Sequence, residues 1–270
     1  MRRALKIADL HFTVANIFRG WNRLFEQALS VLKAGHVGLW LGLLRRQQLY
    51  ALTAIYYDRS GQYVDPTYNT SGLFGWERAA VTRYFPDEGS ILVPACGGGR
   101  ELDAFARAGY RTTGFDPDER YVGVAQSADW GCVAHAPIIL HALPDEVPVG
   151  VGVHDVCVLG WGAYTHLAGR AERIAFLKRI GEVLKPGAPL LLSFWSTVRS
   201  NRQLRISHAI AVMMARLSFN SRRPEFGDWL GRHFAHYFDE TMVREELQAA
   251  GFEPQFIAME PYGHAVARRC

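Results

Sequence analysis

The stretch that decides the fold is ILVPACGGGRELDAFARAGYRTTGFDPD, residues 91–118. Its apolar start predicts a buried strand, the spacing of Leu102, Phe105 and Ala106 predicts a helix over 101–108, and residues 110–116 predict a second strand. Three adjacent glycines, residues 97–99, remove every Cβ where the chain turns from strand to helix. A ligand can therefore lie against the main chain there. A plain tight turn without a ligand stays the alternative at this point.

Asp116 adds a second feature, because it stands nineteen residues beyond Gly97, at the end of the second expected strand. A carboxylate in that position accepts hydrogen bonds from the hydroxyl groups of a ribose. A dinucleotide-binding turn would carry a small residue three places after Gly99, whereas this chain has Leu102 there. The ligand indicated is therefore a nucleoside.

From residue 90 onward, short apolar runs alternate with helical patterns, which is typical of a parallel sheet with crossover helices. Further strands are expected in 155–161 and 188–195, helices in 170–184 and 239–252, and a final edge strand in 261–269. Residues 1–58 are expected to be helical, with Trp21, Leu24, Phe25, Ala28 and Leu32 on one face. A polar, tyrosine-rich loop over 56–76 separates the two parts.

Taken in order, these motifs resemble the class I S-adenosylmethionine-dependent methyltransferases over about residues 74–270. The motifs are residues 91–118, HDVCVLGWGAYTHL (154–167), LKRIGEVLKPGAPLLLSFW (177–195) and LQAAGF (247–252). The Val-Pro-x-Cys-Gly form of the glycine turn is most similar to the thiopurine and thiol methyltransferase branch. Val93 departs from the family, since many members carry an acidic residue there, and Ala95 replaces the family's first glycine.

The resemblance implies an α/β fold: a Rossmann-like, doubly wound, seven-stranded sheet with an N-terminal helical extension and a helical insert after strand five. The expected division is a helical extension and lid loop over 1–73 and a methyltransferase domain over 74–270, with the insert at about 197–230. The resemblance also implies S-adenosylmethionine as cofactor and these cofactor-binding residues: Ala95, Cys96, Gly97 and Gly99 at the methionine part, Asp116 at the ribose, Pro117 at the adenine, and Gly160 and Trp161 near the sulfonium.

Acceptor residues are expected in two places. Tyr164 and His166 follow a strand at the sheet edge where ligands bind, and His166 is a candidate general base; a purely structural role for His166 is the alternative. Tyr63, Tyr68 and Asn69 are candidates for a lid over the acceptor, or for an aromatic staple that fixes the N-terminal helices. His233 and His236 stand three apart on a possible helix, but without a third ligand nearby no metal site is expected.

Charge and composition limit the partners. Residues 1–58 carry a net charge of +5, and residues 197–223 contain six arginines, Arg199, Arg202, Arg205, Arg216, Arg222 and Arg223, and no acidic residue. These tracts attract an anionic substrate or a membrane surface, or they are simply solvated helix faces, which is the commoner case. The longest uncharged apolar run, Ala34 to Leu44, is eleven residues and too short to span a bilayer, so a membrane is not favoured as a partner and an interfacial helix stays the alternative. The modest charge and the lack of a suitable motif argue against nucleic acid.

The sequence therefore predicts a methyltransferase that acts on an N, S or O atom of a small molecule, with an acidic acceptor favoured by the basic insert. Four scattered cysteines and no secretory pattern at the start favour the cytoplasm. A peptide or protein methyltransferase, and a non-catalytic subunit that binds S-adenosylmethionine, are the alternatives.

Overall fold

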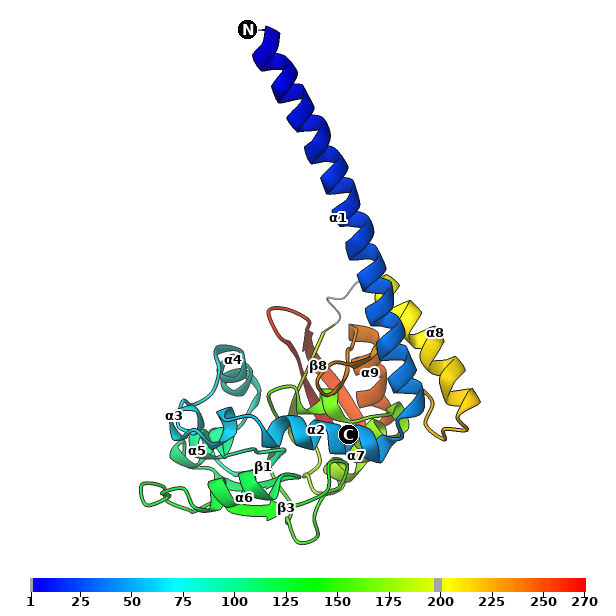
Figure 1. Cartoon of the computed structure of the whole chain (residues 1–270). Helices are drawn as coiled ribbons and strands as arrows, with labels where there is room; N and C mark the ends of the chain where they lie inside the picture. The colour runs from blue at the N-terminus through cyan, green and yellow to red at the C-terminus, as the bar shows by residue number, and fades with distance from the viewer. Residues whose placement is uncertain (1, 197–200) are drawn as a thin grey trace.

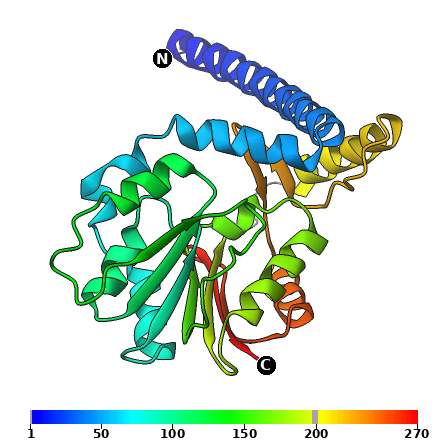
Figure 2. The ribbon, with the colours of Figure 1, turned by 90° about the horizontal axis from the view of Figure 1, so that it is seen from below.

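The computed structural model describes residues 2–196 and 201–270, with side chains from residue 10 to 196 and from 202 onward. Within these residues a seven-stranded sheet has the order β3-β2-β1-β4-β5-β9-β8 (Figures 1 and 2). Strands β1 to β5 are parallel, and β9 runs antiparallel to both neighbours. The doubly wound, Rossmann-like sheet expected from the sequence is confirmed. The strands are β1 (Ser90–Pro94), β2 (Arg111–Asp116), β3 (Ile138–His141), β4 (Val156–Leu159), β5 (Pro189–Phe194), β8 (Phe252–Ala258) and β9 (Gly263–Arg269).

Helices cover both faces of the sheet. They are α4 (Gly75–Tyr84), α5 (Arg100–Arg107), α6 (Glu119–Gln126), α7 (Arg170–Glu182) and α9 (Glu240–Ala249). Because side chains alternate along a strand, Ile91 and Val93 pack in one apolar cluster and Leu92 packs in the other. Leu102 and Phe105 of α5 are buried in the first cluster, as the spacing predicted.

The position of the C-terminal strand in the sheet differs from the expectation. Residues 261–269 were expected at the sheet edge, whereas β9 lies between β5 and β8, and β8 forms the edge. Residues 263–267 are all buried, as an interior strand requires. Strand β8 contains Pro254, which cannot donate a backbone hydrogen bond and is tolerated at an edge.

The N-terminal helix α1 (Arg2–Leu43) is 42 residues long and projects from the globular part (Figure 1). Only its C-terminal part packs on α8 (Asn201–Leu217), through residues that include Ala34, Val37 and Leu41. The expected shared face of Trp21 and Phe25 exists but is not packed, since the two side chains are 68% and 70% exposed. No helix among the described residues is both long and apolar enough to cross a bilayer.

After β5 the chain enters the insert, whose first residues, Thr197 and Arg199 among them, lie outside the described residues. Helix α8 is followed by a hairpin of β6 (Asp228–Leu230) and β7 (Phe234–His236), so the insert is helical only in part. The expectation of a helix that carries His233 and His236 is wrong: His236 lies on β7 and His233 in the turn before it. A hairpin places these two side chains on different elements of structure.

Candidate active site

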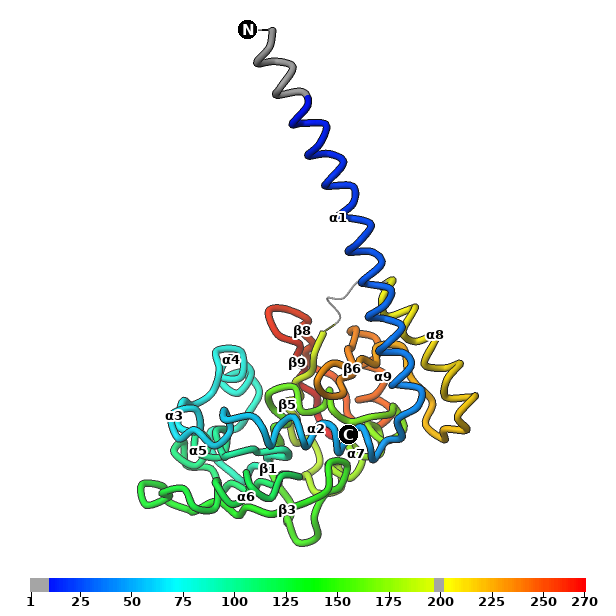
Figure 3. Tube along the Cα trace, in the orientation of Figure 1, coloured from blue at the N-terminus to red at the C-terminus, as the bar shows by residue number. Residues whose placement is uncertain are grey.

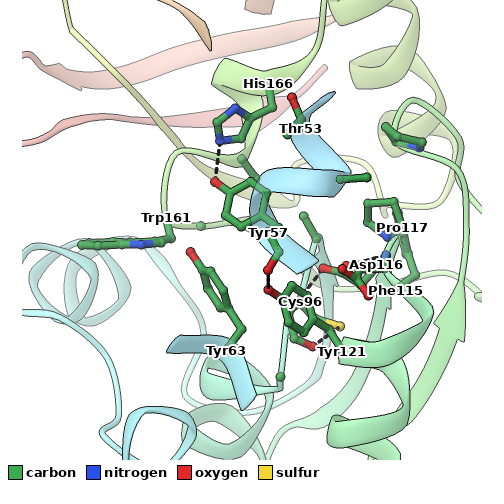
Figure 4. Close-up of a pocket in the computed structure, with 18 of the residues that line it drawn as sticks. Thr53, Tyr57, Tyr63, Cys96, Phe115, Asp116, Pro117, Tyr121, Trp161 and His166 are labelled. Atoms are coloured by element: carbon green, nitrogen blue, oxygen red, sulfur yellow. Dashed lines mark hydrogen bonds between the residues drawn. The ribbon is translucent and has the colours of Figure 1, made fainter. Parts of the chain in front are cut away.

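A cavity of about 640 Å³ opens where β1, β2 and β4 end. Its roof is helix α2 (Arg46–Asp58) together with the short helices η1 (Gln62–Val64) and α3 (Pro66–Asn69). We call residues 62–69 the lid segment. Eleven of the thirteen residues predicted from the sequence line this cavity: Tyr63, Tyr68, Asn69, Ala95, Cys96, Gly97, Asp116, Pro117, Gly160, Trp161 and His166. Several are drawn in Figure 4.

Gly99 is one of the two predicted residues outside the cavity lining. It precedes α5 in the left-handed conformation with φ 101°, and a Cβ there would face Ala125 and Trp130 in the protein interior. Gly98 lines the cavity instead. The glycine turn therefore starts the helix with one glycine and faces the ligand with the preceding two.

The sequence suggested a glycine turn open to a ligand. In the structure the lid segment covers this turn. A Cβ on Gly98 would lie 1.9 Å from the carbonyl oxygen of Tyr63 and 2.4 Å from Asn69 Nδ2, and a Cβ on Gly97 would lie 3.1 Å from the Tyr63 ring. The Asn69 side chain donates a hydrogen bond to that same carbonyl at 3.0 Å. The glycines thus allow the lid segment to approach the turn, in addition to any ligand.

Asp116 stands at the end of β2 with its side chain turned back to the glycine turn (Figure 4). Its Oδ2 accepts the N–H of Gly97 at 2.7 Å, and its Oδ1 accepts the N–H of Asp118 at 2.9 Å. Burial raises the pKa of this carboxyl to about 6, while the two backbone donors oppose the rise. Each oxygen keeps a lone pair for a further donor, so the carboxylate can still accept hydroxyl groups.

A polar corner lies beside the glycine turn, and its main residues were not predicted. Arg100 is 2% exposed and donates to both oxygens of Glu77, at 2.7 and 2.8 Å, and to Glu101 at 2.6 Å. Burial raises the pKa of Glu101. In the sequence, Arg100 and Glu101 look like ordinary polar residues in the first turn of a helix. Their buried ion-pair partner Glu77 lies more than twenty residues earlier, so no local pattern predicts the contact.

Three buried polar atoms in this corner have no hydrogen-bond partner: Tyr68 Oη, Asn69 Oδ1 and Arg100 Nε. Buried polar atoms are normally satisfied, because an unsatisfied one costs about 1–3 kcal/mol. The three side chains belong to cavity-lining residues. Their free donors and acceptor are suited to the charged amino and carboxylate groups of an amino acid.

His166 forms a hydrogen-bonded pair with Tyr57, which the sequence analysis did not identify. The Tyr57 hydroxyl lies 2.8 Å from His166 Nε2 (Figure 4). His166 Nδ1 lies 2.9 Å from the carbonyl oxygen of Phe234. Because a carbonyl only accepts, Nδ1 carries the proton and Nε2 accepts from Tyr57. Burial lowers the pKa of His166 to about 4, so the ring is neutral near pH 7.

Tyr164 is the second predicted residue outside the cavity lining. Its side chain is fully buried, and its hydroxyl donates to Glu246 on α9 at 2.6 Å. Its ring stacks on Phe238. This position does not fit the expected catalytic role, because Tyr164 faces the core on the side of α9. His166, two residues further along the chain, faces the cavity.

Trp161 occupies the wall between β4 and the roof. Its ring lies between those of Phe74 and Tyr262, with centroid distances of 4.4 and 5.3 Å. The residue adopts φ 46°, an uncommon value for a bulky side chain. Its packing against these two rings fixes the Trp161 side chain at the cavity wall.

The charged residues that line the cavity are mostly acidic. They are Asp58, Glu101, Asp116, Asp118 and Glu119, against the single cation Arg100, which is already paired. Among the described residues, no arginine of the insert lines the cavity. The site therefore attracts cations and neutral polar groups more than anions.

A second group of ionisable side chains lies outside the cavity lining, where Glu225, Asp228 and His236 approach one another closely. Asp228 binds Arg222 at 2.7 Å and His236 at 2.8 Å, and Glu225 binds Arg173 at 2.8 Å. Burial opposes ionisation of Asp228, but His236 and Arg222 together lower its pKa. Two arginines thus balance the carboxylates, and the group ties the hairpin to α7.

Comparison with known proteins adds independent findings. Residues 92–192 match the model of a methyltransferase domain family. No curated protein matches the sequence. The chain is similar in structure to an S-adenosylmethionine-dependent methyltransferase from Methanosarcina mazei, with 20% identity, a TM-score of 0.57, and coverage of 73% of this chain and 98% of the other.

Two further solved structures are similar. One is the 1,6-didemethyltoxoflavin-N1-methyltransferase of Burkholderia thailandensis, with 16% identity, a TM-score of 0.58, and coverage of 84% of this chain and 91% of the other. The other is the amino pentose methyltransferase CalS10 from Micromonospora echinaspora, with 17% identity, a TM-score of 0.51, and coverage of 82% and 97%. At these identities the likeness concerns the fold. Together, the match over residues 92–192 indicates a methyltransferase domain, and the similar structures show the fold that such domains have.

Proposed function

We propose that this chain transfers a methyl group from S-adenosylmethionine to a weakly basic nitrogen atom of a small, uncharged acceptor. The observation that carries the choice of acceptor is the charge of the cavity lining, in which five carboxylates face one arginine that is already paired. An acidic acceptor, which the basic insert favoured at the level of sequence, would find only Arg100 as a cation among the described lining residues, and Arg100 is already paired with Glu77 and Glu101.

The residues present fit the cofactor. Asp116 would accept the ribose hydroxyls, Pro117 would lie beside the adenine, and Ala95, Cys96, Gly97 and Gly98, which line the cavity, would contact the methionine part. The unpartnered atoms of Tyr68, Asn69 and Arg100 offer donors for its carboxylate and an acceptor for its ammonium. When bound, S-adenosylmethionine supplies a methyl group on a positively charged sulfur.

The Tyr57–His166 hydrogen bond supports a role in removing the acceptor's proton. The acceptor would donate its proton to the Tyr57 oxygen while the Tyr57 proton passes to His166 Nε2. With a pKa of about 4, His166 is too weak a base to ionise an alcohol, but it suffices for a weakly basic nitrogen compound, whose protonated form gives up its proton readily. This reasoning favours nitrogen over the oxygen and sulfur acceptors that the sequence left open.

The size and cover of the cavity support a small acceptor over a peptide, because α2 and the lid segment lie over it. The similar structures include an N1-methyltransferase and an amino pentose methyltransferase, which agrees with this choice. We propose, further, that residues 1–73 act as extension and lid and 74–270 as the transferase domain. The likeness of the Val93-Pro94 turn to the thiopurine and thiol branch stays a prediction.

The test is a methyl-transfer screen with radiolabelled S-adenosylmethionine and formation of S-adenosylhomocysteine as the readout. A heteroaromatic nitrogen compound, its carboxylated analogue, a phenol, a thiol and a short basic peptide form a suitable panel. We expect the uncharged heteroaromatic compounds to be methylated with the highest kcat/KM. A carboxylated analogue or a peptide that is methylated faster contradicts the proposed acceptor class, and tight cofactor binding without turnover on any compound favours the non-catalytic subunit.

A further inference from the structure

Helix α1 exposes a continuous apolar face along most of its length. We call this face the apolar stripe; it consists of Leu10, Val14, Ile17, Phe18, Trp21, Leu24, Phe25, Leu29, Leu32, Leu39 and Leu43, each at least 37% exposed. At 100° per residue these positions fall within an arc of about 140°. Trp21 and Phe25 near its centre are 68% and 70% exposed, so the stripe has no partner within the described chain.

The stripe is held away from the globular part by the opposite side of the same helix. Ala34, Val37 and Leu41 are buried against α8, and a Cβ on Gly38 would lie 2.5 Å from the Ser207 carbonyl oxygen. Figure 3 shows the C-terminal part of α1 beside α8. Within this part, Leu39 remains exposed. The close contact with α8 therefore fixes the helix while it leaves the stripe free.

The polar side of the projecting part is mainly basic. Between residues 10 and 33 it carries Arg19, Arg23 and Lys33 against the single acid Glu26. The neighbouring helix α8 has no acidic residue and exposes Arg202, Arg205 and Arg216. It also ends in exposed apolar side chains, with Leu217 66% and Phe219 92% exposed.

This combination identifies the chemistry of the partner. An aromatic and aliphatic stripe below a basic polar side matches the boundary between acyl chains and anionic headgroups. The arginines and the lysine prevent the helix from crossing the bilayer, so it would lie in the plane of the surface. A two-helix coiled coil buries a narrower seam, usually of aliphatic residues, whereas here Phe18, Trp21 and Phe25 follow one another at the centre of a wide arc.

We propose that α1 binds the protein to an anionic lipid surface, with the apolar stripe in the interface and α8 adding positive charge beside it. Burial of the stripe also explains how a helix of this length is stabilised, since helices in water depend on packing of their apolar side. The inference departs from the expectation that a membrane is not a favoured partner, which rested on the length of apolar runs. It is independent of the methyl acceptor.

The experiment is co-flotation of the full chain with vesicles of phosphatidylcholine that contain phosphatidylserine, and with vesicles of phosphatidylcholine alone. We expect binding to the anionic vesicles that weakens with added salt. The double variant Trp21→Gln/Phe25→Gln should lower the partition at least about tenfold, because two large apolar side chains lose their burial. The matched control Asn22→Ala/Gln27→Ala, on the polar side of the same turns, should bind like the wild type.

The wild type, the double variant and the control variant should bind S-adenosylhomocysteine with the same affinity. Equal affinity shows that the globular part is intact in all three. The proposal is overturned if the wild type stays unbound with anionic vesicles, if it binds both vesicle types equally, or if the double variant binds like the control. It is also overturned if light scattering finds a wild-type dimer that the double variant converts to a monomer, since the stripe would then pair two copies of the chain.

Discussion

Replacement of Gly98 by alanine tests the covered glycine turn most directly. The added methyl group would stand 1.9 Å from the Tyr63 carbonyl oxygen and 2.4 Å from Asn69 Nδ2, far inside van der Waals contact. Gly98 does not use a left-handed backbone conformation, so the alanine backbone itself is unstrained. Without ligand, the effect on unfolding therefore measures the approach of the lid segment to the turn.

The cost follows from that geometry. Overpacking of this kind costs about 1–3 kcal/mol, and displacement of Tyr63 also breaks the 3.0 Å hydrogen bond from Asn69, worth about 1 kcal/mol. We expect a loss of about 2–4 kcal/mol, which for a protein of this size lowers Tm by about 4–8 °C. Because Tyr63 and Asn69 line the cavity, affinity for S-adenosylhomocysteine should fall as well.

Thermal unfolding without ligand and calorimetric titration with S-adenosylhomocysteine measure the two effects. The matched control is Gly123→Ala in α6, where an added Cβ meets nothing within 4 Å; alanine there should stabilise the helix by up to about 1 kcal/mol. If Gly98→Ala has the Tm and the affinity of the wild type, the lid segment does not rest on the glycine turn.

Three further results are expected. Asp116→Ala should weaken cofactor binding about tenfold or more through loss of the ribose acceptor, and unchanged calorimetric affinity would refute the position assigned to the ribose. Since burial raises the pKa of Asp116 to about 6 and the ribose favours the ionised form, KM for S-adenosylmethionine should rise as the pH falls through 6. Over the same range kcat at saturating cofactor should stay level, because His166 is neutral down to about pH 4; a kcat titration near the ordinary histidine pKa would contradict the lowered value. Tyr57→Phe and His166→Ala should each lower kcat about tenfold to a hundredfold with little change in cofactor affinity, and wild-type rates would leave the pair a structural role only.

Local patterns determined much of the fold. The strand, glycine turn, helix and strand of residues 91–116 could be predicted because side-chain alternation, helical spacing and the lack of a Cβ act within a few residues. For the same reason the buried face of α5 and the place of Asp116 at the end of β2 were predicted correctly. The position of β9 between β5 and β8 was not predicted. Both strands lie near the C-terminus, and which of them pairs with β5 depends on strands that are distant in the sequence.

The side-chain partners in the site were decided by the tertiary structure. His166 meets Tyr57 across 109 residues, Tyr164 meets Glu246 across 82, and the glycine turn meets Tyr63 more than thirty residues before it. No sequence spacing encodes such contacts, because they arise only when helices and strands have packed. The sequence likewise determined that Trp21 and Phe25 share one helix face, but only the packing of α1 on α8 through its other side decided that this face remains open to a partner.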